Sequence, residues 1–439
     1  MHAPPDVRSS KGAASTGSES RFSIVCLSSQ EWASPLPTNR QQIMRRAAAR
    51  GHRVLFVETG GFLGRHVVRL LRGPSRRSLV RRLLHGEAVE TGVVVRKALN
   101  VVPWGQKFSI SNNVNGWVSR RTLRRTVDGL PAPRVTWLYD PRATWAIGRV
   151  ADVFGVYDCV DDYAEQAAGE RNRALVAAAD RRAARTARLV FTTTNALYER
   201  HRRTNAHTNL VGNAADFDHF SAAVDRALAP ARLARLPRPV LGFVGNIAEN
   251  KVDFCLLRRL ADADGSRTIL LAGPADAASK DEFVQLAKRP NVVWIGPVSY
   301  ARVPRVVAAF DVALIPYAEN AYTRNVFPLK LYEYLAAGKP VVASGLPELG
   351  GLEPDVVVAR GREVFESAVA AALSLTSEAD VVRRQSLAAA NTWDARAGRL
   401  IDLVAQELEA VQPSNGIEGR MPCLRGSDSG SCEEPGRYS

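Results

Sequence analysis

The sequence predicts an α/β protein made of two similar halves, each with a sheet of parallel strands. Short β-branched apolar runs alternate with Ala-, Arg- and Leu-rich stretches of helical length, which is typical of βαβ units. The alternation breaks once, over residues 221–239, and then starts again. Apolar residues make up 46% and charged residues 23% of the 439, close to globular averages, so most of the chain is expected to fold.

The first half, residues 21–220, is expected to form a Rossmann-like domain. Its predicted strands are 22–27, 53–58, 93–102, 134–139, 153–160 and 189–193. A helix is predicted over 39–50, because Gly51 can adopt the left-handed conformation that often follows a helix. Residues 1–20 lack the apolar core of a signal peptide and are predicted to be a disordered leader.

The second half, residues 240–393, is expected to form another Rossmann-like domain. A linker with three prolines precedes it over 221–239. Its predicted strands are 240–244, 268–272, 292–296, 312–316 and 340–343. A helix is predicted over 394–411, and the polar, Gly/Ser-rich residues 412–439 are predicted to be a disordered tail.

The charge balance predicts an anionic partner. Lys and Arg number 59 against 44 Asp and Glu, a formal charge of +15, which fits nucleic acid, a membrane surface or a phosphorylated substrate. No apolar stretch is long enough to span a bilayer, and the five cysteines form no CxxC pair, so a reducing cytoplasm is expected. The absence of Gly-x-Ser-x-Gly, Walker and Gly-x-Gly-x-x-Gly motifs disfavours hydrolases, P-loop NTPases and dinucleotide oxidoreductases.

Residues 325–344, NVFPLKLYEYLAAGKPVVAS, contain the strongest signal for a ligand site. Pro328 suits the first turn of a helix and Gly338 its end, so the loop before the helix would present free backbone N–H groups to an anion. Lys330 would add a positive charge, and Glu333 would lie one turn further, within reach of hydroxyl groups. The alternative is an ordinary amphipathic helix with a solvated Lys and Glu.

The motif Pro-x-Lys-Leu-Tyr-Glu-Tyr-Leu-Ala-x-Gly-Lys-Pro-Val-Val, residues 328–342, resembles the donor site of family 4 retaining glycosyltransferases. The resemblance implies the GT-B fold, two Rossmann-like domains with parallel sheets facing across a cleft. It also implies a nucleotide-diphosphate sugar as donor substrate, with no metal or other cofactor. Glu333 would hold the ribose, and the diphosphate and sugar would lie at Phe327, Pro328, Leu329 and Lys330.

Further segments resemble the same family, from about residue 22 to residue 410. They imply donor contacts at Gly245, Asn246 and Lys251 in a phosphate loop, at Gly273 after the next strand, and at Ile295, Gly296 and Pro297 beside the base. The helix over 394–411 would pack back on the first domain. Within the family, WASPLPTNRQQI, YDCVDDY and PLKLYEYLA look most like cell-wall polysaccharide glycosyltransferases of the teichuronic-acid type.

Two positions depart from the family pattern. Asn325 stands where the first glutamate of a Glu-x7-Glu pair is usual, eight residues before Glu333. Asn both donates and accepts hydrogen bonds, so the identity of the sugar is open. Asn246 replaces the usual arginine after Val-Gly and leaves Lys251 as a shifted candidate for diphosphate charge.

The acceptor is expected in the first domain, near Asp161 and Asp162. These residues follow a predicted strand in YDCVDDY, and ligands bind at that edge of doubly wound sheets. Either carboxylate could orient the acceptor hydroxyl; the alternatives are metal binding or capping of the next helix. Asp140 and Arg142, after another strand, are weaker candidates.

Two basic segments, 64–85 and 117–125, interleave arginines with apolar residues. Basic amphipathic helices are typical of proteins that lie on a membrane surface, and a solvated Arg-rich helix is the alternative. Nucleic acid is disfavoured because no binding motif accompanies the charge. A cytoplasmic protein, peripheral on the inner face of the membrane, is therefore predicted.

These observations together predict a hexosyltransferase-type retaining glycosyltransferase of cell-envelope or exopolysaccharide synthesis. The acceptor would be a saccharide or a lipid-linked saccharide. Lys330, Asp161 and Asp162 would be its catalytic residues, with Lys330 stabilising the departing diphosphate. The alternatives are a nucleotide-sugar epimerase or hydrolase of the same fold, and a non-catalytic sugar-nucleotide binding protein.

Overall fold

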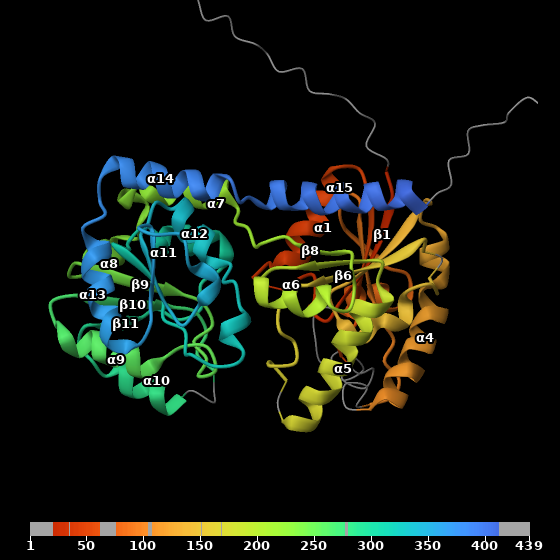
Figure 1. The fold of residues 1–439 in the computed structure, drawn as a ribbon, viewed down its shortest axis with the longest axis horizontal. Helices are drawn as coiled ribbons and strands as arrows, with labels where there is room; N and C mark the ends of the chain where they lie inside the picture. Colours follow the sequence, from red (N-terminus) through yellow and green to blue (C-terminus); the bar gives the residue numbers. More distant parts are fainter. Residues whose placement is uncertain are drawn as a thin grey trace, which may run out of the picture.

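A computed structural model describes residues 21–34, 36–61, 76–103, 108–150, 152–167, 169–276 and 280–411 of the chain. They form two α/β domains side by side (Figure 1). The predicted leader, 1–20, and tail, 412–439, lie outside the described residues. Within the described part of the chain, no helix is both long and apolar enough to cross a bilayer.

The N-terminal domain is built on an eight-stranded sheet with the order β3-β4-β2-β1-β5-β6-β7-β8. Its strands are β1 (Ser23–Ser28), β2 (Arg53–Glu58), β3 (Glu87–Glu90), β4 (Val93–Lys97), β5 (Arg134–Leu138), β6 (Phe154–Cys159), β7 (Leu189–Thr192) and β8 (Thr208–Leu210). All neighbours are parallel except β3 and β4, which are antiparallel. The expectation of a wholly parallel sheet is therefore wrong at this edge, where only two residues separate β3 from β4 and leave no room for a crossover.

The helices of this domain are α1 (Asn39–Ala49), α3 (Arg76–Leu84), α4 (Ser109–Asp128), the 3-10 helix η1 (Pro141–Ala146), α5 (Glu170–Thr186) and α6 (Asn195–Arg202). Helix α1 begins with a capping box between Thr38 and Gln41, and Gly51 follows it with a φ of 92°. The predicted helix over 39–50 is thus confirmed to within one residue. Helix α1 places Arg40 in its first turn.

The C-terminal domain has a six-stranded sheet with the order β11-β10-β9-β12-β13-β14, parallel throughout. Its strands are β9 (Val240–Val244), β10 (Thr268–Ala272), β11 (Val292–Trp294), β12 (Val312–Ile315), β13 (Val341–Ser344) and β14 (Val356–Ala359). Its helices include α9 (Phe254–Ala263), α10 (Lys280–Ala287), α11 (Val303–Val307), α12 (Lys330–Ala336), α13 (Arg362–Leu373) and α14 (Glu378–Ala389). The strand order reverses between β9 and β12, the kind of position where doubly wound sheets bind ligands.

Residues 221–239 are packed against the C-terminal domain. They contain the short helices η2 (Ala222–Val224), η3 (Arg226–Leu228) and α8 (Ala231–Ala234), and they follow α7 (Phe217–Ser221). Ala223 and Leu233 are buried in the same apolar cluster as β9 and β12. Asp311 accepts hydrogen bonds from Arg226 and Arg238, which fixes this segment to the domain.

Helix α15 (Trp393–Val411) follows the C-terminal domain but packs on the N-terminal one (Figure 1). It contributes six buried residues to the core of the first sheet: Trp393, Ala397, Leu400, Ile401, Val404 and Leu408. Arg396 donates to the carbonyl oxygen of Val211 at 2.5 Å and lies 3.6 Å from the buried Asp158 carboxylate. Burial lowers the pKa of Arg396, because the guanidinium loses its hydration.

Candidate functional site

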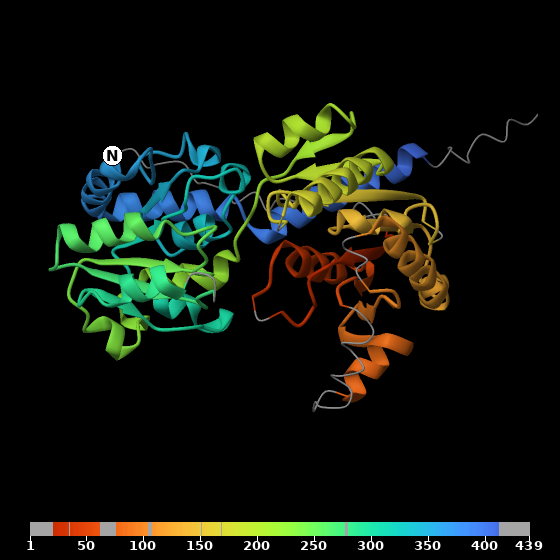
Figure 2. The ribbon, with the colours of Figure 1, turned by 90° about the horizontal axis from the view of Figure 1, so that it is seen from below.

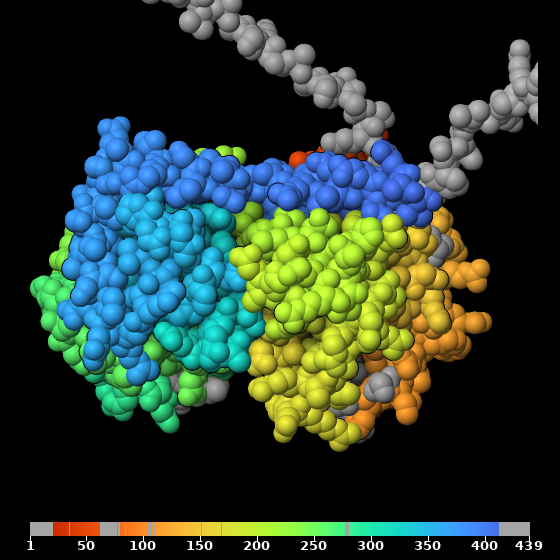
Figure 3. Space-filling view, viewed as in Figure 1, coloured from red at the N-terminus to blue at the C-terminus, as the bar shows by residue number. Residues whose placement is uncertain are grey.

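The two domains meet where the segments after β6 and β7 face the segments after β12 and β13. Asn325 Nδ2 donates to Asp162 Oδ2 at 2.9 Å, and Gln166 Nε2 donates to Tyr322 Oη at 3.3 Å. Glu348 accepts from the backbone N–H groups of Asn195 and Ala196, at 2.9 and 3.1 Å, at the start of α6. Figure 3 shows the two lobes in contact along this seam, with a notch between them at the lower edge.

Three neighbouring loops form a glycine platform at the carboxyl ends of β9, β10 and β11. Gly245 donates to the Ala272 carbonyl and Gly273 donates to the Gly296 carbonyl, both at 2.8 Å. Gly273 has a φ of 135°, and a Cβ there would lie 1.9 Å from the oxygen of Gly245. Only glycine allows this approach, so the predicted residues Gly245, Gly273 and Gly296 lie side by side.

Lys330 lies over this platform. Its Nζ is 3.4 Å from Tyr317 Oη and 5.5 Å from the centroid of the Phe243 ring. A Cβ at Gly245 would be 2.4 Å from Lys330 Cε, so glycine makes room for the lysine side chain. Burial lowers the pKa of Lys330, while the nearby Glu333 carboxylate acts in the opposite direction.

Glu333 lies one turn after Lys330 on α12. Burial raises the pKa of Glu333 to about 7, against the opposing effect of the Lys330 ammonium. The Glu333 charge also contributes to the raised pKa of Tyr300, which burial dominates, so Tyr300 lies near Glu333. Tyr300 comes three residues after Pro297, which links the predicted base loop to this carboxylate.

Asp161 is the half-buried carboxylate on the N-terminal side of the seam. Burial raises the pKa of Asp161, and the charges of Lys251 and Arg40 act to lower it. Asp161 thus lies near one cation of each domain, Arg40 of the N-terminal domain and Lys251 of the C-terminal domain. Its Oδ1 atom is buried and accepts no hydrogen bond from the described residues, an unusual state for a buried oxygen.

Asp162 is held by protein groups. Its Oδ2 accepts from Arg200 at 2.6 Å and from Asn325 at 2.9 Å, and its side chain is 1% exposed. These donors outweigh burial and keep the pKa of Asp162 below its usual value. The two adjacent aspartates therefore differ, since Asp162 is already paired and Asp161 keeps a free oxygen.

The contact with Asp162 explains why residue 325 is an asparagine and not a glutamate. A glutamate here would bring a second carboxylate next to Asp162, and like charges at this distance repel. The amide instead donates a hydrogen bond across the seam. Asn325 is thus matched to a residue of the other domain.

The remaining predicted donor residues lie around this centre. Lys251 Nζ is 5.7 Å from the Tyr322 ring centroid, and Asn246 is exposed. The Phe327 ring stacks on Tyr332 with centroids 5.6 Å apart. Pro328 is buried and Leu329 packs against the apolar core of the N-terminal domain. Ile295 and Pro297 line a separate cavity of about 630 Å³ together with Arg302 and Arg305.

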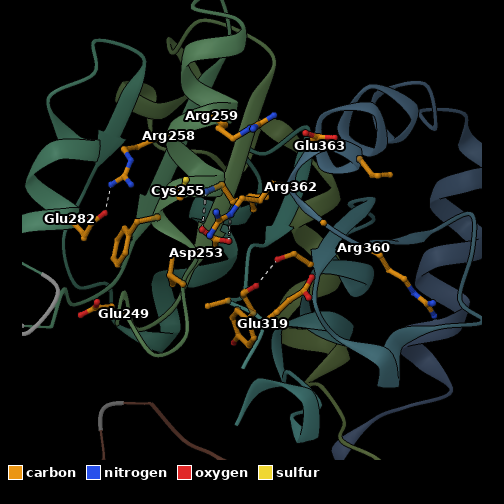
Figure 4. Close-up of a pocket in the computed structure, with 18 residues that line it drawn as sticks. Glu249, Asp253, Cys255, Arg258, Arg259, Glu282, Glu319, Arg360, Arg362 and Glu363 are labelled. Carbon is orange, nitrogen blue, oxygen red and sulfur yellow. Dashed lines mark hydrogen bonds and ion pairs between the residues drawn. The ribbon is translucent and has the colours of Figure 1, made fainter. Parts of the chain in front are cut away.

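A larger cavity, of about 790 Å³, lies between the starts of α9 and α13 (Figure 4). None of the predicted donor residues lines it. Its walls contain the five carboxylates of Glu249, Asp253, Glu282, Glu319 and Glu363 and the four arginines 258, 259, 360 and 362. Two of these arginines are paired, Arg258 with Glu282 and Arg362 with Asp253 at 2.8 Å. This near-neutral balance gives the cavity little attraction for a diphosphate.

Cys159, Asp180 and His201 form the one group of potential metal ligands found among the described residues, with ligand atoms within 4.8 Å of one another. Asp180 Oδ1 accepts from Tyr157 Oη at 2.5 Å and Oδ2 lies 3.5 Å from His201 Nε2. All four residues are buried; Tyr157 and Cys159 belong to β6, the strand that leads to Asp161, and Asp180 and His201 to α5 and α6. This polar network ties α5 and α6 to β6.

Asp140 has a structural role in the described chain. It accepts from the Arg142 backbone at 3.1 Å at the start of η1 and from Thr59 Oγ1 at 2.8 Å. Its ion pair with Arg142 helps to keep the pKa of Asp140 low despite burial. The weaker candidate of the sequence analysis is thus a helix cap.

Sequence reasoning missed four residues of the seam: Arg40, Tyr317, Tyr322 and Glu348. Arg40 donates to Tyr163 Oη at 3.2 Å and to Gln30 Oε1 at 2.9 Å. Tyr317 and Tyr322 follow β12 in IPYAENAY, and polar aromatic residues after a strand were the available signal. Nothing local marks Glu348, because its partners lie 152 and 153 residues away.

Comparison with known proteins agrees with this geometry. Residues 238–375 match the family model described as "Glycosyl transferases group 1". TuaH of Bacillus subtilis (strain 168), a glycosyltransferase named for teichuronic acid biosynthesis, is 34% identical over 218 residues, covering 46% of this chain and 53% of that protein. D-inositol 3-phosphate glycosyltransferase of Mycobacterium marinum is 34% identical over 160 residues, 35% of this chain and 32% of that protein. The chain thus spans about half and a third of these relatives.

Solved structures show the same fold over most of the chain. Sucrose-phosphate synthase from Thermosynechococcus elongatus superposes with a TM-score of 0.65 at 16% identity, covering 89% of this chain and all of that one. HepE from Anabaena, solved in complex with UDP and glucose, has a TM-score of 0.59 at 15% identity, covering 88% and 99% of the two chains. The predicted GT-B architecture of two domains facing across a cleft is therefore confirmed.

Proposed function

We propose that this chain, whose residues 238–375 match the family model described as "Glycosyl transferases group 1", transfers a sugar from a nucleotide-diphosphate donor to an acceptor with retention. The observation that supports this most is the half-buried Lys330 over the glycine platform, one helical turn from Glu333. A partly desolvated ammonium without a carboxylate in an ion pair with it is costly, and a diphosphate would offset that cost.

The donor would lie on the C-terminal domain, residues 240–393. Gly245, Gly273 and Gly296 let it approach the backbone closely, and Lys330 with Lys251 would neutralise the diphosphate. Glu333 would accept hydrogen bonds from ribose hydroxyls. Ile295 and Pro297 would lie on the side of the base, and Asn246, Asn325, Phe327, Pro328 and Leu329 would complete the site.

The role of Glu333 gives a pH-dependent prediction. Only the ionised carboxylate accepts from both ribose hydroxyls, and with a pKa of about 7 it is mostly protonated at pH 6 and mostly ionised at pH 8. Affinity for the best of UDP, GDP, TDP and ADP should therefore rise about tenfold between pH 6 and pH 8. Isothermal titration calorimetry at both pH values measures this change.

Glu333→Gln is the control for the nucleotide's own ionisation. This variant should bind about 1 to 3 kcal/mol more weakly at pH 8, because it loses charge-assisted hydrogen bonds. It should also lose the extra gain in affinity between pH 6 and pH 8. Equal affinity and an equal pH dependence in parent and variant would contradict the assignment.

The acceptor would lie on the N-terminal domain, residues 21–220, with α15 packed behind it. Asp161 is the better candidate to orient the acceptor hydroxyl, because its Oδ1 is free while Asp162 is paired. In a retaining transfer a leaving phosphate oxygen can take the acceptor proton, so a strong protein base is not needed. The relationship to TuaH supports a saccharide or lipid-linked acceptor of cell-envelope polysaccharide synthesis.

An anionic membrane surface is the second partner we propose. Helices α3 and α4 lie next to each other, since Arg96 donates to the Leu83 carbonyl at 3.0 Å and to Thr126 at 2.6 Å. Their exposed arginines are Arg77, Arg81, Arg121, Arg124 and Arg125. Each basic residue near an anionic surface is worth about 1 kcal/mol, which supports reversible docking at the cytoplasmic face.

One part of the expectation for the basic segment 64–85 changes. Arg82 does not face outward, since it pairs with Glu58 at 3.3 Å and Glu87 at 2.5 Å. The expectation that the whole basic segment 64–85 serves membrane docking is therefore wrong at Arg82. Of the basic segment 64–85, residues 64–75 lie outside the described residues.

Vesicle sedimentation tests the docking. The parent should pellet with anionic vesicles at low salt and be released as salt rises, because screening weakens surface charge interactions. Changing Arg121, Arg124 and Arg125 to Ser should leave most of the protein in the supernatant. Changing Arg232, Arg235 and Arg360 to Ser removes the same charge from the other domain and should have little effect. Equal pelleting of the two triple variants would rule out docking through α4.

A further inference from the structure

The interior of the N-terminal domain holds three potential metal ligands that the proposed sugar transfer does not use. Cys159 ends β6, Asp180 lies within α5 and His201 lies within α6, and all three residues are buried. Figure 2 shows the yellow helix α5 and the yellow-green helix α6 next to each other in this domain. Elements that are distant along the chain therefore bring a thiol, a carboxylate and an imidazole to one point.

The spacing of these three side chains fits a tetrahedral metal ion. Cys159 Sγ lies 3.8 Å from Asp180 Oδ1, and His201 Nε2 lies 3.5 Å from Asp180 Oδ2. One ligand atom of each residue lies within 4.8 Å of the other two. Around a tetrahedral zinc ion with ordinary bond lengths, neighbouring ligand atoms are roughly 3.3 to 3.6 Å apart. The two pairs are longer by a few tenths of an ångström, which small side-chain adjustments would remove.

The hydrogen bonds of the cluster leave the His201 ring unsatisfied. Its Nε2 atom is buried and has no hydrogen-bond partner in the described part of the chain, and the side chain is only 2% exposed. The distance of 3.5 Å to Asp180 is longer than an ordinary N–H to O hydrogen bond. Burial lowers the pKa of His201, so the ring is neutral. An ion between the imidazole and the carboxylate would give the buried nitrogen a partner.

Tyr157 holds Asp180 in the way that outer residues hold metal ligands. Its hydroxyl donates to Asp180 Oδ1 at 2.5 Å, and its ring lies edge-on to the His201 ring with centroids 5.9 Å apart. Ligating carboxylates are commonly fixed by such hydrogen bonds. A zinc ion bound by one thiolate, one carboxylate and one neutral imidazole has no net charge, which lowers the cost of burying it.

We propose that Cys159, Asp180 and His201 bind a zinc ion, with the second Asp180 oxygen or a water molecule as the fourth ligand. Sulfur, nitrogen and carboxylate ligands together favour zinc over magnesium and calcium, which prefer oxygen ligands alone. The thiol proton would leave to solvent as the zinc–sulfur bond forms. The ion would join β6, α5 and α6 and would contact no substrate.

This zinc ion would lie directly behind the candidate acceptor loop. Cys159 is two residues before Asp161, and its Sγ lies 3.5 Å from the Asp161 carbonyl oxygen. Arg200, the neighbour of His201 in the chain, donates to Asp162 at 2.6 Å. Two of the ligands are therefore close in sequence to the groups that position the two aspartates. The zinc site itself does not depend on the transfer function, because metal binding is measured without any substrate.

Metal analysis of the full-length protein tests the site. After treatment with a chelator, the parent should take up one tightly bound zinc ion per chain, measured by competition with a zinc-sensitive dye. Cobalt in place of zinc should give a thiolate-to-cobalt charge-transfer band. Tyr157→Phe keeps all three ligands, so it should keep this band and weaken zinc binding about 10- to 100-fold. Cys159→Ser should lose the band and weaken zinc binding more than Tyr157→Phe does.

Other thiols of the chain supply the controls. Cys255→Ser changes a half-buried thiol of the C-terminal domain, and a double change of Cys423 and Cys432 to Ser removes the two thiols nearest the end of the chain. Both proteins should bind zinc and cobalt as the parent does. No zinc uptake by the parent, or an unchanged cobalt band in Cys159→Ser, would overturn the proposal.

Urea unfolding gives a second readout that does not require Cys159→Ser to be as stable as the parent. Zinc should raise the unfolding midpoint of the parent, because a ligand that binds the folded state stabilises it. The midpoint of Cys159→Ser should not respond to the same zinc concentration. A shift of equal size in both proteins would place the zinc ion elsewhere and would overturn the proposal.

Discussion

Lys330→Met should lower turnover by about 10² to 10³, because the ammonium is the group placed to stabilise a departing diphosphate. The same change should not lower the free energy of unfolding. Burial already disfavours the charged form of Lys330, as its lowered pKa shows, and Met fills a similar volume without that cost. Release of nucleoside diphosphate from the best-binding nucleotide sugar measures the first effect, and urea unfolding measures the second.

Lys288→Met is the control, since Lys288 is exposed on the same domain. It should leave turnover unchanged. A Lys330→Met protein that keeps its turnover would remove Lys330 from the chemistry. A loss of turnover together with a large loss of stability would show instead that Lys330 acts by holding Tyr317 and the glycine platform in place.

Asn325→Asp should cost about 2 to 5 kcal/mol of transition-state stabilisation, because it brings a second carboxylate against Asp162 across the seam. Asn325→Ala removes the hydrogen bond without adding charge and should cost less, about 1 kcal/mol. A larger loss of activity in Asn325→Asp than in Asn325→Ala would indicate repulsion between the two carboxylates. Values of kcat/KM for the three proteins measure these differences.

Asp162→Asn in the Asn325→Asp background completes a double-mutant cycle. The exchanged pair can again form an amide-to-carboxylate hydrogen bond, and Arg200 stays near a carboxylate. The double variant should therefore recover at least part of the lost activity. If both substitutions simply add, the two side chains do not act on each other, and the matching of Asn325 to Asp162 is wrong.

The strand pattern of this chain could be predicted well where the strands are buried and apolar. The ranges predicted for β2, β9 and β10 agree with the structure residue for residue. Strands β3, β8 and β14 were missed. EAVE in β3 and TNL in β8 are short and partly polar, and VVVA in β14 is apolar but only four residues long. Strand β4 ends at Lys97 instead of residue 102, since apolar residues continue past the point where pairing with β2 stops.

The candidate site, too, could be predicted from the sequence only in part. Lys330 and Glu333 belong to one motif on one helix, so their local arrangement followed from the sequence. Pairs that cross the seam could not be predicted, because Asn325 and Asp162 are 163 residues apart and each has several plausible partners. The difference between Asp161 and Asp162 also depends on these long-range contacts. Adjacent identical residues look alike in a sequence.

Helix α15 makes the C-terminal domain an insertion within the N-terminal one. The chain leaves the first domain near Ala215 and returns beside it, where Ala215 bonds to Asn391 and Trp393 at 3.0 and 3.1 Å. Domains usually fold in the order of their synthesis. Here the first sheet lacks six of its core residues until α15 has been made, after the whole second domain. The domain that begins the chain is therefore the last to be completed on the ribosome.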